Sequence, residues 1–252
     1  MRTHPVVLAA ALFIAHPLAS QSLAERVANA GDGAVVFTFA ARPEVCGDGH
    51  RMTRIGTSYW TQFGGERGPC VHGPVQVRLT TDAGRVRVVE SWVGAPRARE
   101  GRDLGAVSAS EAAGYLLGVA ASTGSSPGAR AVTAAVFADS AVVWPSLVVL
   151  ARERAAAHRS ARREAMFWLS RFAGAAIAGH PATLGDDDTG ADEVKLHAVF
   201  VMSQLRNGDG IDRLLELARS RAELGVRQRA LFWIGQSGDP RAVTLFESLL
   251  RG

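Results

Sequence analysis

The alternation of apolar and polar residues differs between the two parts of the chain. Residues 75–93 contain two runs with a period of two, VQVRLTT and RVRVVESWV, separated by Asp-Ala-Gly, which predicts a β-hairpin. Residues 34–41, AVVFTFAA, are rich in β-branched and aromatic side chains and predict another strand. A β-rich module is therefore expected over residues 21–105, with the polar stretch 94–106 as a connector.

From residue 106 to residue 252 the apolar positions recur with the helical period, which predicts a helical domain. Ser108 and Glu111 have the spacing of a capping box and indicate where its first helix begins. Near the end of the chain, Asp239 is expected to cap a last helix that has Pro240 at its first position.

One segment of this helical part occurs three times. The copies are ARREAMFWLSR from residue 161, VKLHAVFVMSQ from residue 194 and VRQRALFWIGQ from residue 226. Their alignment brings Phe167, Phe200 and Phe232 to the same position, with spacings of 33 and 32 residues. A helical repeat of this length predicts a solenoid, in which each helix pair buries its apolar face against a neighbouring pair.

The repeated segment resembles HEAT repeats, particularly the short bacterial kind. The second helix of such a repeat begins Val-Arg and continues with a small residue, Leu and Gly, and VRQRALFWIG at 226–235 fits this pattern best. The resemblance covers about residues 130–252 and implies an armadillo-type, right-handed α-solenoid that binds proteins. The sequence departs from the pattern at the glycine-interrupted first helix, 173–184, and at Leu250, where the array ends without a complete final cap.

The helical wheel of the repeat predicts a binding surface. Val226, Ala230 and Ile234 fall on the core-facing arc, whereas Phe232 lies on the opposite side. The three aligned Phe residues are therefore expected to form a ladder with a polar rim, as protein-binding grooves have. The rim residues are His197, Gln204, Gln236, Arg171 and Arg229. The alternative is that these Phe side chains pack against adjacent helices or are covered by the β-module.

The N-terminus predicts export. Arg2 precedes the apolar run 5–15, and small residues follow, which is the layout of a secretory signal peptide over residues 1–20. No later segment is apolar and long enough to span a membrane, so we expect a periplasmic or extracellular protein. Cys46 and Cys70 then meet an oxidising compartment, where a disulfide between them is expected.

Two metal sites are alternatives to these interpretations. Cys46 and Cys70 could bind zinc together with His50 and His72, although thiols oxidise after export. The acidic run 185–193 could bind calcium, but its order of acids does not match a calcium loop, and a solvated loop is the other interpretation. Neither site is part of the expected function, which requires no metal and no other cofactor.

Charge and motifs restrict the function further. The net charge is +4, and 27 of the 28 basic residues are Arg, which we interpret as codon bias. Nucleophile-elbow, zinc-protease and phosphate-loop motifs do not occur, so an enzyme is not predicted.

The expected fold is α+β, a small disulfide-stapled antiparallel β-module followed by a short HEAT-like right-handed α-solenoid. The expected function is a non-enzymatic scaffold that binds a protein of unknown identity and no nucleic acid. One alternative is an enzyme or enzyme accessory with a site at the junction of the two parts, around residues 44–50. The other is an anionic-surface binder that uses clustered arginines, namely Arg152, Arg154, Arg159, Arg162 and Arg163.

Overall fold

A computed structural model describes residues 21–50, 52–55, 58–61, 69–179, 193–205 and 209–252. The strands are β1 Gly33–Phe39, β2 Val45–Gly47, β3 Met52–Ile55, β4 Ser58–Thr61, β5 Val75–Asp82, β6 Arg85–Val93 and β7 Arg102–Ala106. The first helices are α1 Leu23–Ala30, α2 Ala109–Ser122, α3 Ser125–Val136 and α4 Trp144–Arg152. The 3₁₀ turn η1 Ala156–His158 precedes α5 Arg159–Ile177, α6 Glu193–Ser203, α7 Asp209–Arg219, α8 Leu224–Gln236 and α9 Arg241–Arg251.

The larger sheet has the strand order β6-β5-β1-β7. β5 and β6 pair antiparallel over the residues where the alternation predicted a hairpin, and Ala83 and Gly84 in the turn have positive φ angles of 50° and 67°. β7 pairs parallel to β1, so the sheet is mixed rather than antiparallel as expected. The prediction that 94–106 is only a connector was wrong for its last five residues. Strand β7 is held through its main chain at a sheet edge and exposes most of its side chains, so it has no apolar alternation.

A smaller sheet, β2-β3-β4, carries the predicted disulfide. Cys46 lies in β2, and its Cα is 5.3 Å from that of Cys70, within the normal range for a bridged pair. Val71, next to Cys70, forms an isolated antiparallel bridge with Gly47. The disulfide therefore ties the segment that enters the larger sheet at Val75 to strand β2.

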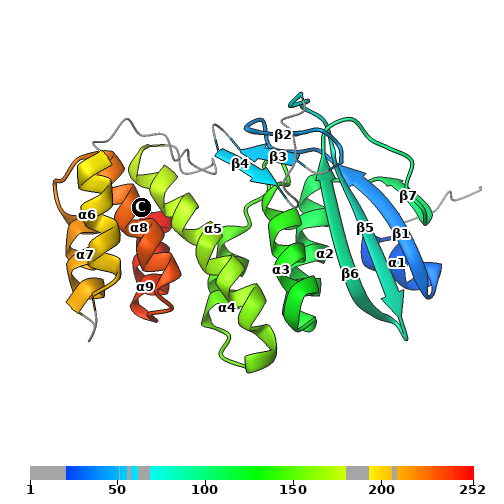
Figure 1. Ribbon diagram of the computed structural model, residues 1–252. Coiled ribbons are helices and arrows are strands. Elements are labelled where there is room, and N and C mark those ends of the chain that lie inside the picture. The colour runs from blue at the N-terminus through cyan, green and yellow to red at the C-terminus, as the bar shows by residue number, and fades with distance from the viewer. Residues whose placement is uncertain (1–20, 51, 56–57, 62–68, 180–192, 206–208) are drawn as a thin grey trace, which may run out of the picture.

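Helices α2 and α3 join the sheet to the rest of the molecule. Ser108 caps α2, and its hydroxyl accepts a hydrogen bond from the main-chain N of Glu111 at 3.2 Å. The Glu111 carboxylate accepts from the main-chain N of Leu23 in α1, so it links two helices. Helix α3 packs on β6, and the buried side chains of sheet and helices form one continuous core (Figure 1).

The six helices from α4 to α9 do not follow one another in space. In Figure 1, α8 and α9 lie between the pair α6 and α7 and the pair α4 and α5. Helix α5 packs against α8 and α9, whereas α6 packs against α7 and α8. The chain therefore goes first to the far end of the array and then returns to fill the space in the middle.

The directions of the helices also change within the array. Gln228 of α8 donates to the carbonyl oxygen of Gly174 at 2.9 Å, and Gly235, two turns later, lies against Met166 and Ser170. Helix α8 therefore runs antiparallel to α5. It runs parallel to α6, because Lys195 pairs with Glu223 at the start of the two helices and Phe200 contacts Trp233 further along.

Two expectations for the repeats need correction. The segment 173–184 does not begin a new helix, because residues 173–177 form the last turns of α5. Gly174 lies against Gln228 of α8, and residues 180–184 lie outside the described residues. The C-terminal helix α9 is not an uncapped end of the array, because it packs on α4 and α5. The free end consists of α6 and α7.

Candidate functional site

A continuous row of aromatic rings connects α5, α8 and α6. Phe167 meets Phe232 edge to face with centroids 6.3 Å apart, and Phe232 meets Trp233 at 5.0 Å. Trp233 contacts Phe200 at 5.1 Å, and Phe200 contacts His197 at 5.9 Å. We call these five residues the aromatic column. The three aligned Phe residues lie along it, but Trp233 joins Phe200 to Phe232.

Exposure increases along the column toward the free end. Phe167 and Phe232 are half-buried, whereas Phe200 is 38% exposed. Nε1 of Trp233 is buried and has no hydrogen-bond partner among the described residues, so this ring contributes by packing. The larger sheet packs on α3 at the opposite end of the molecule, away from the column (Figure 1). Neighbouring helices thus cover the inner rings, and the outermost ring faces solvent.

The predicted rim residues have different environments. His197, Gln204 and Gln236 are exposed, and Arg229 is half-buried. Arg171 is only 6% exposed and is not a rim residue, because α5 is covered by neighbouring helices on several sides and its side chain points into the packed array. Of the three exposed residues, His197 contacts a ring of the column directly, at Phe200.

The free end of the array exposes large apolar side chains. Val201 of α6 is 49% exposed, Leu205, two residues after α6, is 47% exposed, and Phe200 of α6 is 38% exposed. We call these three residues the free-end patch. The apolar residues of α6 are spread around the helix rather than gathered on one face, and a helix of that kind is normally buried. The apolar run LHAVFVM in the sequence indicated such a helix. A helical-wheel projection, however, does not show that α6 would lie at the end of the array.

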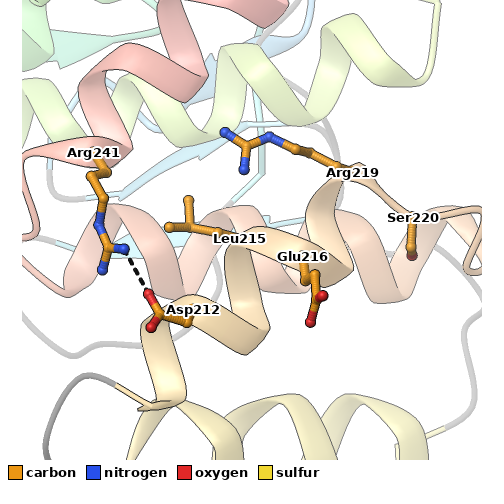
Figure 2. A pocket seen from close by; sticks show the side chains of 6 residues that line it. All are labelled: Asp212, Leu215, Glu216, Arg219, Ser220 and Arg241. Carbon is orange, nitrogen blue, oxygen red and sulfur yellow. Dashed lines mark hydrogen bonds and ion pairs between the residues drawn. The ribbon is translucent and has the colours of Figure 1, made fainter.

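A charged groove is lined by residues of α7 and α9. It has a volume of about 590 Å³ and is lined by Asp212, Leu215, Glu216, Arg219, Ser220 and Arg241, as Figure 2 shows. Arg241 pairs with Asp212 at 2.6 Å, and both side chains are more than half exposed, so the pair contributes little to stability.

Arg241 also interacts with Asp239 at the start of α9. The Asp239 carboxylate accepts from the main-chain N of Arg241 at 2.8 Å and also pairs with its guanidinium, which lowers the pKa of Asp239. The predicted capping carboxylate is therefore in contact with the first turn. The helix begins at Arg241 rather than at Pro240, one residue later than expected.

A pocket of about 430 Å³ lies at the junction of the β-module and the helices. Arg42 lines it, and its guanidinium donates to the carbonyl oxygens of Val136 and Ala141 at 2.7 and 2.8 Å. Burial lowers the pKa of Arg42. Its guanidinium lies 5.5 Å from the ring centre of Phe172, so this cation connects the two parts of the protein. Glu44 also lines the pocket, whereas His50 is exposed and its main-chain N donates to Asp48.

Three further candidate sites were the zinc site, the calcium run and the arginine cluster. Both cysteines of the alternative zinc site are joined in the disulfide. The alternative calcium run falls almost wholly on residues outside those described. In the arginine cluster, Arg152 pairs with Glu247 and Arg162 donates to the carbonyl oxygen of Glu153 at 2.8 Å.

Residues 226–252 match the family model of the PBS lyase HEAT-like repeat. The match includes α8 and α9 and confirms the HEAT resemblance for this segment. The curated proteins and the solved structures contain no match to the chain. Within the described ranges, no helix has both the length and the apolar character needed to cross a bilayer.

Proposed function

We propose that the protein is a non-enzymatic scaffold that binds another protein at the free end of its helical array. The observation that carries this proposal is the free-end patch, where Val201 and Leu205 are each at least 40% exposed. HEAT-like repeats commonly serve as protein-interaction modules, and the matched segment adjoins this patch. The fold alone does not identify a function, so the proposal rests on the patch.

The chemistry of the patch favours a protein partner. Repeat arrays usually end in a helix with a polar outer face, because an apolar end aggregates. Here the end helix exposes the neighbouring Phe200 and Val201, and exposed apolar side chains that lie together mark interaction sites. Phe200 supplies an aromatic anchor that is fixed from behind by Trp233, and His197 and Gln204 supply polar contacts around it.

We further propose that the protein acts after export, in the periplasm or outside the cell. The predicted signal peptide and the Cys46–Cys70 disulfide support this location, since disulfides persist in oxidising compartments. The partner would then be an envelope or secreted protein.

Comparative capture tests the proposal. Immobilised protein lacking residues 1–20 is exposed to envelope extract of the source cell, and bound proteins are identified by mass spectrometry. The test variant is Val201→Ser/Leu205→Ser, which leaves the packed Phe200 in place. The matched control is Val142→Ser/Val149→Ser, because these side chains are 76% and 69% exposed but lie elsewhere.

We expect a protein that is retained by the wild type and the control but lost from the test variant, while circular dichroism shows all three folded. Retention of the same proteins by all three would contradict the proposal. Loss from both variants would contradict it as well, because it would reflect general surface stickiness rather than this patch.

A further inference from the structure

A separate trough lies at the opposite end of the molecule, between the tip of the β5–β6 hairpin and helices α1, α2 and α3. Its volume is about 970 Å³, at the upper end of the range typical for small-molecule sites. Val86 of the hairpin, Tyr115 and Val119 of α2 and Pro127 of α3 provide its apolar walls. We call it the hairpin trough.

The wall formed by α2 has space beside it. Gly118 lines the trough, and a Cβ atom added there would meet nothing within 4 Å. Burial raises the pKa of the neighbouring Tyr115 hydroxyl, as expected of a wall with little water. A ligand can therefore approach the helix closely at Gly118.

The Ser and Thr hydroxyl groups in the trough already have partners. Ser122 donates to the carbonyl oxygen of Gly118 at 2.9 Å, and Thr123 donates to that of Val119 at 2.6 Å. These hydroxyls satisfy the end of their own helix, so they offer a ligand few strong polar contacts. The walls consequently favour an apolar ligand body.

The charged residues that line the trough are both positive. Arg85 and Arg87 of β6 line it, and no Asp or Glu is among its described lining residues. Arg87 has a partner in Asp82 at 3.2 Å, but that pair is more than half exposed and therefore weak. Within the described part of the chain no ion pair involves Arg85. An apolar trough with two guanidinium groups is complementary to an apolar chain with an anionic head.

We propose that the hairpin trough binds a free fatty acid. The acyl chain lies against Val86, Val119 and Gly118, and the carboxylate faces Arg85 and Arg87. This site is independent of the free-end patch and goes beyond protein binding. Burial of each methylene strengthens binding by up to about fourfold, whereas the exposed arginines mainly select for the anionic head.

Titration with dodecanoate tests the proposal. Binding to the protein lacking residues 1–20 is measured by calorimetry, below the micelle concentration, with decanoate and dodecanol as comparison ligands. We expect decanoate to bind about tenfold more weakly than dodecanoate, because two methylenes are missing. The double variant Arg85→Gln/Arg87→Gln should weaken dodecanoate binding at least threefold and leave dodecanol binding unchanged.

Two glycines in one helix provide a matched pair of variants. Gly118→Leu fills the trough and should weaken dodecanoate binding at least tenfold. Gly114→Leu adds the same side chain one turn earlier, where a Cβ also meets nothing within 4 Å, but Gly114 is not among the trough residues. It should bind like the wild type.

Absence of dodecanoate binding to the wild type would overturn the proposal, as would equal binding by both glycine variants. Binding to vesicles of anionic phospholipid without binding of dodecanoate would also overturn it, and would point to a membrane surface instead. Thermal unfolding of each variant shows whether it is folded. If Gly118→Leu does not fold, the arginine variant decides the outcome by its effect on dodecanoate relative to dodecanol.

Discussion

Glu164 is a half-buried carboxyl group in the helical core. Its Oε1 atom accepts hydrogen bonds from the Thr133 hydroxyl at 2.6 Å and from Nε1 of Trp168 at 2.9 Å. Burial raises the pKa of Glu164, although these two bonds oppose the shift. The native state therefore holds this proton more tightly than the unfolded state does.

This shift predicts a pH dependence of stability. Because the native pKa lies above the unfolded one, the free energy of unfolding falls as the pH rises through the ordinary carboxyl range toward neutrality. Glu164→Gln keeps an acceptor for both donors but cannot ionise. We expect the variant to gain on the order of 1 kcal/mol relative to the wild type between pH 4 and pH 7.

Urea denaturation of both proteins at these two pH values measures that difference. An equal dependence on pH in the two proteins would show that the carboxyl group is not destabilised by burial.

Arg42 is a second residue whose substitution should change the stability. Its removal leaves the carbonyl oxygens of Val136 and Ala141 without their side-chain donor in a buried region. Arg42→Met should therefore lower the free energy of unfolding by about 2–4 kcal/mol. Arg78→Met is the control, because Arg78 is a partly exposed cation on the sheet, and it should cost less than about 1 kcal/mol.

Denaturant titrations that show equal losses for the two methionine variants would contradict the role assigned to Arg42. This role could not be predicted from the sequence, because an Arg that precedes a Pro just after a strand is typical of a surface position.

The contact between α5 and α8 depends on two small residues. A Cβ atom on Gly235 would lie 2.9 Å from the Cβ of Ser170 and 3.1 Å from the carbonyl oxygen of Met166. Gly235→Ala should therefore destabilise the protein by about 1–3 kcal/mol despite the better helix propensity of Ala. Gly114→Ala, in open space on α2, should instead stabilise it by about 0.5–1 kcal/mol.

The sign of the change in melting temperature distinguishes these two outcomes. If Gly235→Ala were also stabilising, α5 and α8 could not pack as closely as the structure shows.

Elements with a strong local pattern could be predicted from the sequence. β5, β6 and the start of α2 have such patterns, in the alternation of 75–93 and in the Ser108 cap. Strand β7 has no such local pattern, because it pairs with β1 through main-chain atoms, which do not depend on the amino-acid sequence. The continuation of α5 through Gly174 was missed because Gly lowers helix propensity but does not by itself end a helix.

At the scale of the whole molecule, the repeat predicted which faces are apolar but not the order of the helices. Alignment of Phe167, Phe200 and Phe232 suggested a uniform ladder, and the three rings do lie in one aromatic column. The spacing of 33 and 32 residues contains no information on whether successive units stack in order. Long-range packing of α9 on α4 and α5 decides this, and it leaves α6 at the free end.

The proposed binding site depends on that order, so a measurement of which helices are adjacent tests it most directly. The chain contains one lysine, Lys195, whose Nζ atom lies 2.9 Å from Oε2 of Glu223. Zero-length carbodiimide crosslinking should join these two residues and show that α6 lies beside α8. Arg152→Lys places a second amine on α4 opposite Glu247 of α9, where an ion pair now exists.

We expect the Arg152→Lys protein to form a second crosslinked peptide, between residues 152 and 247, that disappears in denaturing urea. This result would show that α9 packs on α4 and that α6 and α7 form the free end. A Lys195–Glu223 crosslink without the second one would mean that the helices stack in the order of the chain. The free end, and with it the proposed protein-binding patch, would then lie elsewhere.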